Sequence, residues 1–177
     1  PVLGTHARLR SRFEIPPMTL DGTAYARDTV YGDRRGDIQL DADFEGISWL
    51  QENVQGPPVI LAGLTPNYRW GGRISVYTGR PTIIGWQWHQ EQQRWDYSRL
   101  VGLRIDDVNR IYGTNNPQEA LSLLNEYGVR YVYVGQLERL YYPQEGLDKF
   151  ERMIGAGLSK VFQSQQVAIY RVSDDGA

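Results

Sequence analysis

Apolar residues recur at helical spacing in several parts of this 177-residue chain. In the clearest case, the segment 43–54, they would form one buried helical face. These positions are Phe44, Ile47, Leu50 and Val54. A second segment begins with Asn116 followed by Pro117, which is typical of a helix start, and it is followed by Gly128 where the helix would end. The predicted helices are 43–54, 106–112, 117–127 and 147–154.

Short runs of β-branched and aromatic residues separate these helices. The clearest is 129–134, "VRYVYV", which is typical of a strand buried on both faces. The other predicted strands are 59–61, 81–85, 161–162 and 167–172. The segment 73–79 fits a short helix or a strand equally well. This order predicts an α/β layered domain with a mixed sheet of about five strands flanked by helices, in which the last two strands are antiparallel.

Residues 1–42 show no sustained periodicity and are rich in Gly, Pro and Asp. Such a segment is typical of an extended arm that wraps a domain or links it to a neighbour. We therefore divide the chain into an arm or linker over 1–42 and a single α/β domain over 43–177.

Composition excludes several classes of function. The net charge is −2, whereas nucleic-acid binding requires a basic surface. The absence of cysteine excludes disulfides, thiolate metal sites and a cysteine nucleophile. No apolar run approaches the length that spans a membrane, so we expect a soluble piece of a longer protein. Only Lys149 and Lys160 are lysines, so 17 of the 19 basic residues are arginine.

The segment 78–97 places three tryptophans, Trp86, Trp88 and Trp95, among Gln, Glu, Arg and His side chains. Flat aromatic faces beside amides suit a polar ligand such as a carbohydrate. The alternative is that part of the stretch is core or meets a partner surface, and periodicity does not separate the two. His89 is in turn either a surface imidazole or a ligand-contacting group.

Familiar cofactor and catalytic motifs are absent. No Gly-rich phosphate loop follows the first strand, and no Ser nucleophile elbow is present. His89 and Glu91 lack a third metal ligand at motif spacing. We therefore expect no cofactor and no metal.

Several phrases in one order resemble the C-terminal soluble region of the YYY family of large polytopic bacterial and archaeal membrane proteins. These phrases are "TLDGTAY", "GISWLQENV", "GGRISVYTGRPTIIGWQWHQEQQR", "DDVNRIYGTNNPQEALSLLNEYGVRYVYVGQLERLYYP" and "GLDKFERM". The family is similar to C-type membrane glycosyltransferases. The resemblance implies a parent protein in the cell membrane and a soluble domain on its extracytoplasmic side, with the segment 1–42 leading from the last membrane helix.

The resemblance also implies a candidate substrate site. Its residues are Arg73, Trp86, His89, Glu91 and Arg94. The arginines would hold the phosphate or carboxylate of a lipid-linked sugar, and His89 would bind it or transfer a proton. The family pattern has an acid directly after the histidine, whereas here Gln90 intervenes before Glu91.

These observations lead to two main hypotheses. The first is an accessory domain, not catalytic alone, that packs on the transmembrane region of the same polypeptide or helps to bind a lipid-linked sugar. The alternative is a self-contained soluble hydrolase that uses His89 with Glu91 or Asp107. A purely structural module is a third reading.

Overall fold

The computed structural model describes residues 19–93 and 96–173, and it is a mixed α/β fold. A four-stranded sheet has the order β3 (Val59–Leu61), β4 (Val129–Val134), β6 (Ala168–Val172) and β5 (Leu158–Gln163). Strand β3 is parallel to β4, while β6 is antiparallel to both β4 and β5. The predicted fold class and the closing antiparallel pair are therefore confirmed.

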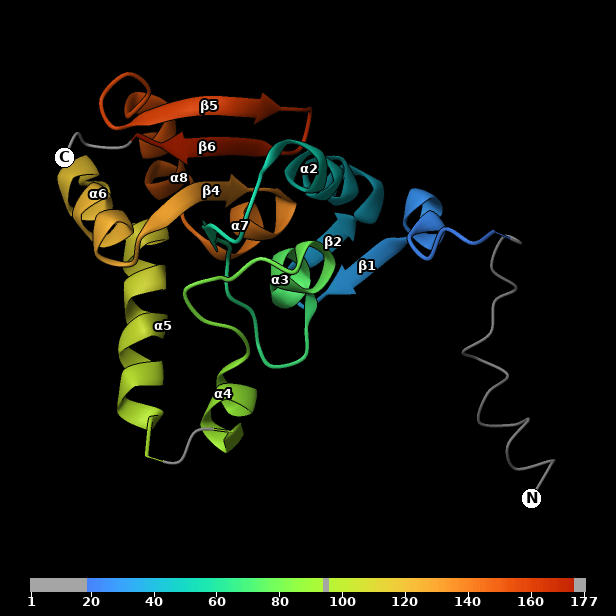
Figure 1. Cartoon of the computed structure of the whole chain (residues 1–177), viewed down its shortest axis with the longest axis horizontal. Helices are drawn as coiled ribbons and strands as arrows, with labels where there is room; N and C mark the ends of the chain where they lie inside the picture. The colour runs from blue at the N-terminus through green and yellow to red at the C-terminus, as the bar shows by residue number, and fades with distance from the viewer. Residues whose placement is uncertain (1–18, 94–95, 174–177) are drawn as a thin grey trace.

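Helices cover both faces of this sheet, with α5 and α6 on one side of β4 and α2 and α3 on the other (Figure 1). The α-helices are α2 (Leu40–Asn53), α3 (Arg73–Thr78), α4 (Gln87–Gln93), α5 (Ser98–Gly113), α6 (Pro117–Glu126), α7 (Gln136–Tyr141) and α8 (Gln144–Arg152). Short 3-10 helices are η1 (Ala24–Asp28) and η2 (Trp70–Gly72).

Alternate residues of β4 enter different cores, because successive side chains in a strand point to opposite faces. Val132 and Val134 belong to the larger cluster, which contains residues of α5, α6 and α8. Tyr131 and Tyr133 belong to the second cluster, with residues of α2 and α3. Burial on both faces explains the nearly continuous apolar run in β4.

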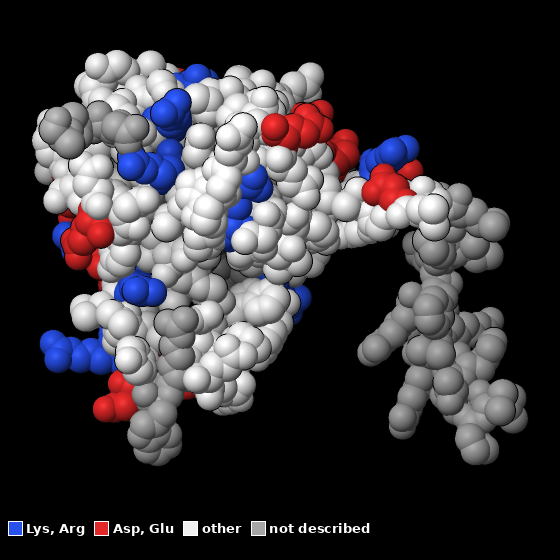
Figure 2. Space-filling model, in the orientation of Figure 1, with Lys and Arg blue, Asp and Glu red and all other residues white. Residues whose placement is uncertain are grey.

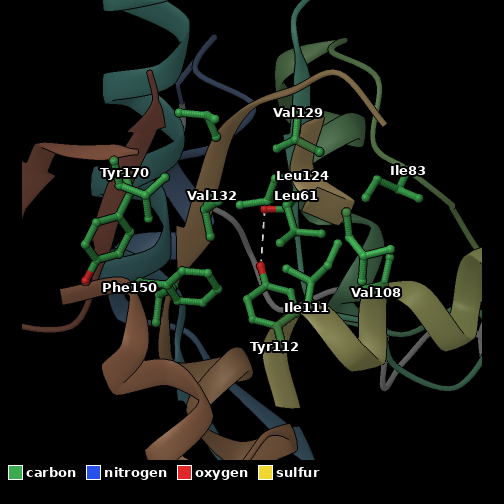
Figure 3. Packing of buried hydrophobic residues seen from close by; sticks show 14 of the residues in the cluster. Leu61, Ile83, Val108, Ile111, Tyr112, Leu124, Val129, Val132, Phe150 and Tyr170 are labelled. Carbon is green, nitrogen blue, oxygen red and sulfur yellow. Dashed lines mark hydrogen bonds between the residues drawn. The ribbon is translucent and has the colours of Figure 1, made fainter. Parts of the chain in front are cut away.

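Tyr112 connects α5 to the two parallel strands. Figure 3 shows its hydroxyl pointing to the carbonyl oxygen of Leu61, which lies 3.2 Å away. The same hydroxyl donates to the carbonyl oxygen of Tyr133 at 2.7 Å. Burial raises the pKa of Tyr112 well above its usual value, which keeps the hydroxyl protonated as a donor.

The segment 1–42 contains regular structure where it is described. A hairpin of β1 (Val30–Asp33) and β2 (Gly36–Gln39) follows η1, and α2 already begins at Leu40. Ala26, Ile38 and Leu40 are buried with Leu137 of α7 in a third cluster. Residues 1–18 lie outside the described part.

The structure corrects several local predictions and decides one that was open. The segment 81–85 is not a strand, because Pro81 has no N–H to donate and only its carbonyl bonds to β3, through Ile60 N at 2.9 Å. The ambiguous segment 73–79 is helix α3, which ends at Gly79 in the left-handed region with φ 67°. Helix α7 was not predicted, and the helix predicted over 106–112 begins earlier, at Ser98.

Candidate functional site

The carboxyl ends of β3 and β4 are the first place to search for a site. Ligands of open α/β sheets bind beyond the carboxyl ends of parallel strands, and these two are adjacent and parallel. The chain continues from them through Gly63 and Gly135. Arg73, one of the predicted site residues, lies at this edge.

Arg73 is fully buried and contacts two carboxylates. Its Nε lies 2.7 Å from Asp43 Oδ2, and its Nη2 lies 2.9 Å from Glu138 Oε2. The guanidinium carbon is 5.1 Å from the centre of the Tyr133 ring. Burial by itself would lower the pKa of Arg73, but Asp43 and Glu138 outweigh burial and raise it above its usual value.

Glu138 fills the gap between the two strand ends. Its Oε1 accepts a hydrogen bond from Gly63 N and its Oε2 accepts one from Gly135 N, both at 2.8 Å. The side chain therefore reaches back to the backbone at the start of α7, as in a capping box. A Cβ on Gly63 would lie 2.8 Å from Glu138 Oε1, so the close approach requires glycine there.

Asp43 completes the cluster from α2. Its Oδ2 accepts a hydrogen bond from Trp70 Nε1 at 2.6 Å, and its Oδ1 accepts one from the Tyr133 hydroxyl at 3.0 Å. The two buried carboxylates thus have one cation between them and neutral donors for their remaining lone pairs. We call Asp43, Arg73 and Glu138 the buried triad.

The buried triad closes this edge of the sheet. Two backbone N–H groups and a guanidinium form an arrangement that is suited to an anion, but Glu138 of the same chain already occupies it. Arg73 and both carboxylates have no exposed side-chain surface. None of the three therefore faces a ligand from solvent in this structure.

The other predicted site residues are grouped around α4, apart from the buried triad. Trp86 precedes α4 and donates from Nε1 to Arg69 O at 3.2 Å. His89 Nε2 lies 3.0 Å from Gln93 Nε2. The ring of Tyr68 lies between them, with centroids 5.2 Å from Trp86 and 6.4 Å from His89. Arg94 and Trp95 lie outside the described residues.

The acid–histidine pair of the hydrolase hypothesis is not formed. Glu91 is two residues from His89 on the same helix, a spacing at which side chains do not face each other. Glu91 accepts a hydrogen bond from Gln87, at 3.0 Å. Asp107 instead pairs with Arg110 and accepts from the Tyr127 hydroxyl. In the described ranges 19–93 and 96–173, no cluster of three or more His, Asp or Glu side chains is arranged to hold a metal ion.

The sequence did not indicate Asp43 and Glu138 as partners of Arg73. Asp43 lies at the start of the helix predicted over 43–54, and Glu138 lies in α7, which was not predicted. The one available signal was the spacing of Gly135 and Glu138 directly after a strong strand, because a Glu at the third helical position often bonds back to the backbone.

Lys149 is a further buried polar group, on α8. Its Nζ donates to the carbonyl oxygen of Gly146 at 2.6 Å and lies 3.5 Å from that of Tyr112 at the end of α5. The Phe150 ring centre is 4.0 Å away. Burial, and then the positive charge of Arg152, lower the pKa of Lys149 to about 7. The amine thus joins the start of α8 to the end of α5, and no carboxylate of the described residues bonds to it.

Replacing Lys149 by methionine is expected to remove a pH dependence of stability. The unfolded chain keeps the lysine proton up to about pH 10.4, whereas the folded protein releases it near pH 7. Because the unfolded state binds more protons in between, the free energy of unfolding rises by about 2 kcal/mol between about pH 7 and 9. Urea denaturation across this range measures the rise.

The matched control is Lys160→Met, which removes the other lysine, paired with Glu151 at 2.6 Å on the surface. It is expected to keep the pH dependence of the unchanged protein. An equal slope in Lys149→Met and the unchanged protein would contradict the assignment to Lys149.

No helix in the described part of the chain combines the length and apolar character needed to cross a bilayer. Comparison with protein-family models and with curated proteins finds no match. Among solved structures, the fold is similar to the C-terminal globular domain of an oligosaccharyltransferase from Archaeoglobus fulgidus. The likeness covers 73% of this chain and 95% of that one, at 14% sequence identity and a TM-score of 0.46. It concerns the path of the backbone, so a function for this chain has to be argued from its own residues, and membership of the YYY family stays a prediction from sequence motifs.

Proposed function

We propose that this chain is an accessory, extracytoplasmic domain of a membrane glycosyltransferase-like protein and that it is not catalytic by itself. Its partner is the transmembrane region of the same polypeptide. The setting comes from the ordered motifs that resemble the YYY family, which include "GGRISVYTGRPTIIGWQWHQEQQR".

The observation that carries the non-catalytic role is the closed edge of β3 and β4. An α/β enzyme keeps this edge open for substrate, whereas here Glu138 bonds to Gly63 N and Gly135 N and neutralises Arg73. The charged side chains of the buried triad therefore stabilise the fold and do not bind a substrate. This supports a scaffold that presents its surface to a partner.

Within this function, the residues around α4 are the best placed to contact a lipid-linked sugar. Trp86 and His89 are half-buried, and both flank Tyr68. Aromatic faces stack on sugar rings while imidazole and carboxylate groups such as Glu91 orient hydroxyls. Arg94 belongs to this set only by its place in the sequence. Arg73 does not belong to it, because Asp43 and Glu138 enclose its guanidinium in the core.

The first experiment is to read the native reading frame upstream of Pro1. We expect several apolar segments of about 20 residues, the length that spans a bilayer. A frame that encodes only a start codon or another soluble domain would overturn the membrane setting.

A turnover assay tests the non-catalytic part. The chain is incubated with ester, phosphoester and glycoside model substrates, in parallel with His89→Ala. We expect no turnover above the buffer rate. Turnover that disappears in His89→Ala would overturn this part of the proposal and favour the hydrolase alternative.

A further inference from the structure

Exposed apolar side chains gather at one end of the molecule. Ten large hydrophobic residues are exposed in the described part of the chain, and six of them lie between residues 68 and 103. One of the six, Val76, is on α3. The other five are Tyr68 (57% exposed), Trp88 (55%), Tyr97 (50%), Leu100 (39%) and Leu103 (50%). We call them the α4–α5 surface. Scattered apolar residues need no explanation, but a gathered set indicates an interaction site.

Local contacts explain why these side chains lie together. Asn67 Oδ1 accepts a hydrogen bond from Trp88 N at 2.8 Å, which fixes the loop containing Tyr68 against the start of α4. Leu100 and Leu103 are three residues apart on α5 and share a face. Helices α4 and α5 contact each other, and α4 and the first turns of α5 lie at the end of the view opposite β5 (Figure 1).

The charge of this region differs in sign from the rest of the chain. Residues 67–105 contain six arginines and two acidic residues, a net charge of +4, whereas the whole chain has −2, so the remaining residues carry −6. Arg73 is neutralised inside the buried triad, which leaves +3. Figure 2 shows acidic side chains over α2 and η1 and also beside α5, while the surface over α4 that faces the viewer is mostly uncharged.

Among the described residues of this region, the exposed cations are Arg69 and Arg99. Arg69 neighbours Tyr68 in the loop before η2, and Arg99 lies in the first turn of α5 beside Leu100. Tryptophan and tyrosine are enriched where a membrane meets water, and an apolar surface flanked by arginine suits anionic head groups.

We propose that the α4–α5 surface seats on an anionic lipid bilayer, with Trp88, Tyr97 and Leu103 in the head-group region and Arg69 and Arg99 on lipid phosphates. The inference rests on the proposed membrane setting and names the surface that faces the membrane. A second copy of the chain is a poorer occupant, because two surfaces of the same positive sign repel each other. The acidic surface over α2 then faces away from the lipid.

The experiment is flotation of the purified 177-residue chain with phosphatidylcholine vesicles, with and without phosphatidylglycerol. We expect binding to the vesicles that contain phosphatidylglycerol, weakened by added salt. The variant Trp88→Ala/Leu103→Ser is expected to bind at least about 10-fold more weakly, since membrane affinity scales with the apolar area inserted. Arg69→Gln/Arg99→Gln is expected to lose about 5-fold per arginine.

Matched controls are Val76→Ser and Ile154→Ser, which remove exposed apolar side chains on α3 and next to α8, outside the α4–α5 surface. Both are expected to bind as the unchanged chain does. All substitutions are at exposed positions, and thermal unfolding verifies that each variant folds.

The outcomes separate this inference from the proposed function. If no vesicles bind, or if the controls lose as much affinity as Trp88→Ala/Leu103→Ser, the α4–α5 surface is not the lipid-facing surface. The proposed function still stands in that case if the upstream frame encodes membrane segments. The opposite combination is vesicle binding that depends on Trp88 and Leu103 with an upstream frame that lacks such segments. It would support lipid binding by the α4–α5 surface and would contradict the proposal that the parent protein spans the membrane.

Discussion

Replacing Arg73 by methionine is expected to lower the free energy of unfolding by about 3–5 kcal/mol, because it leaves buried carboxylates without their cation. Arg73 is the one cation that contacts both Asp43 and Glu138 in the described part of the chain, and all three side chains have no exposed surface. Methionine fills a similar volume, so the loss reports the charges rather than a cavity. Urea denaturation monitored by tryptophan fluorescence measures it.

The control for this variant is Arg110→Met. Arg110 also pairs with two carboxylates, Asp107 and Glu119, but its side chain is 54% exposed. Water solvates the carboxylates when that arginine is removed, so the destabilisation is expected to be much smaller. A second variant, Arg73→Met/Glu138→Gln, is expected to be more stable than Arg73→Met because one unpaired charge is gone. Equal stabilities of Arg73→Met and Arg110→Met would contradict the role of burial.

Replacing Glu138 by alanine is expected to cost a similar amount, about 3–5 kcal/mol, and small carboxylates are expected to restore part of it. The change leaves Gly63 N, Gly135 N and Arg73 without their shared acceptor. Acetate or formate would occupy the vacated position and stabilise the folded state in proportion to the logarithm of its concentration. Thermal unfolding in rising sodium formate, against sodium chloride at equal ionic strength, measures the recovery.

Two controls distinguish a specific site from a general salt effect. Glu119→Ala removes a carboxylate that pairs with Arg110 near the surface, and formate is expected to leave its stability unchanged relative to chloride. Glu138→Gln keeps the volume but presents an amide to Arg73, so it is expected to be destabilised without recovery in formate. Equal responses of Glu138→Ala and Glu119→Ala would show that no anion site forms at this edge.

Recovery by formate would also inform the proposed function. It would mean that the carboxyl edge of β3 and β4 retains the donors of an anion site and that Glu138 of the same chain fills it. An α/β domain whose ligand position is occupied from within would then act through its surface, as the accessory role requires.

Hydrophobic periodicity was sufficient to predict the elements that bury one face or that are capped by a neighbouring residue. Helix α2 has a buried stripe that includes Ile47 and Leu50. Helix α6 begins where Asn116 was expected to cap it, and Asn116 Oδ1 accepts from Gln118 N and Glu119 N. The apolar run of β4 was enough to predict it as a strand. In each case the signal lies within a few residues of the element that it predicts.

Periodicity failed where the partner of a segment is distant in the sequence. Pro81 and its neighbours have strand composition, but the segment makes a single bond to β3 and forms no ladder. Helix α7 is six residues long, too short to show a helical period. Its position depends on Leu137, which packs in a cluster with Ile38 of β2, and on Glu138, which bonds to Gly63 N after β3 and to Arg73 of α3.

For the candidate site, the sequence by itself determined that Trp86, Trp88, His89 and Glu91 lie close together, because they are neighbours in the chain. It also determined the α/β class, which follows from local hydrophobic patterns. Only the tertiary structure decided that Arg73 belongs to the core, since its partners Asp43 and Glu138 are 30 and 65 positions away. A local hydrophobic pattern predicts that a charged residue is exposed. Only the folded structure supplies the opposite charges that make its burial stable.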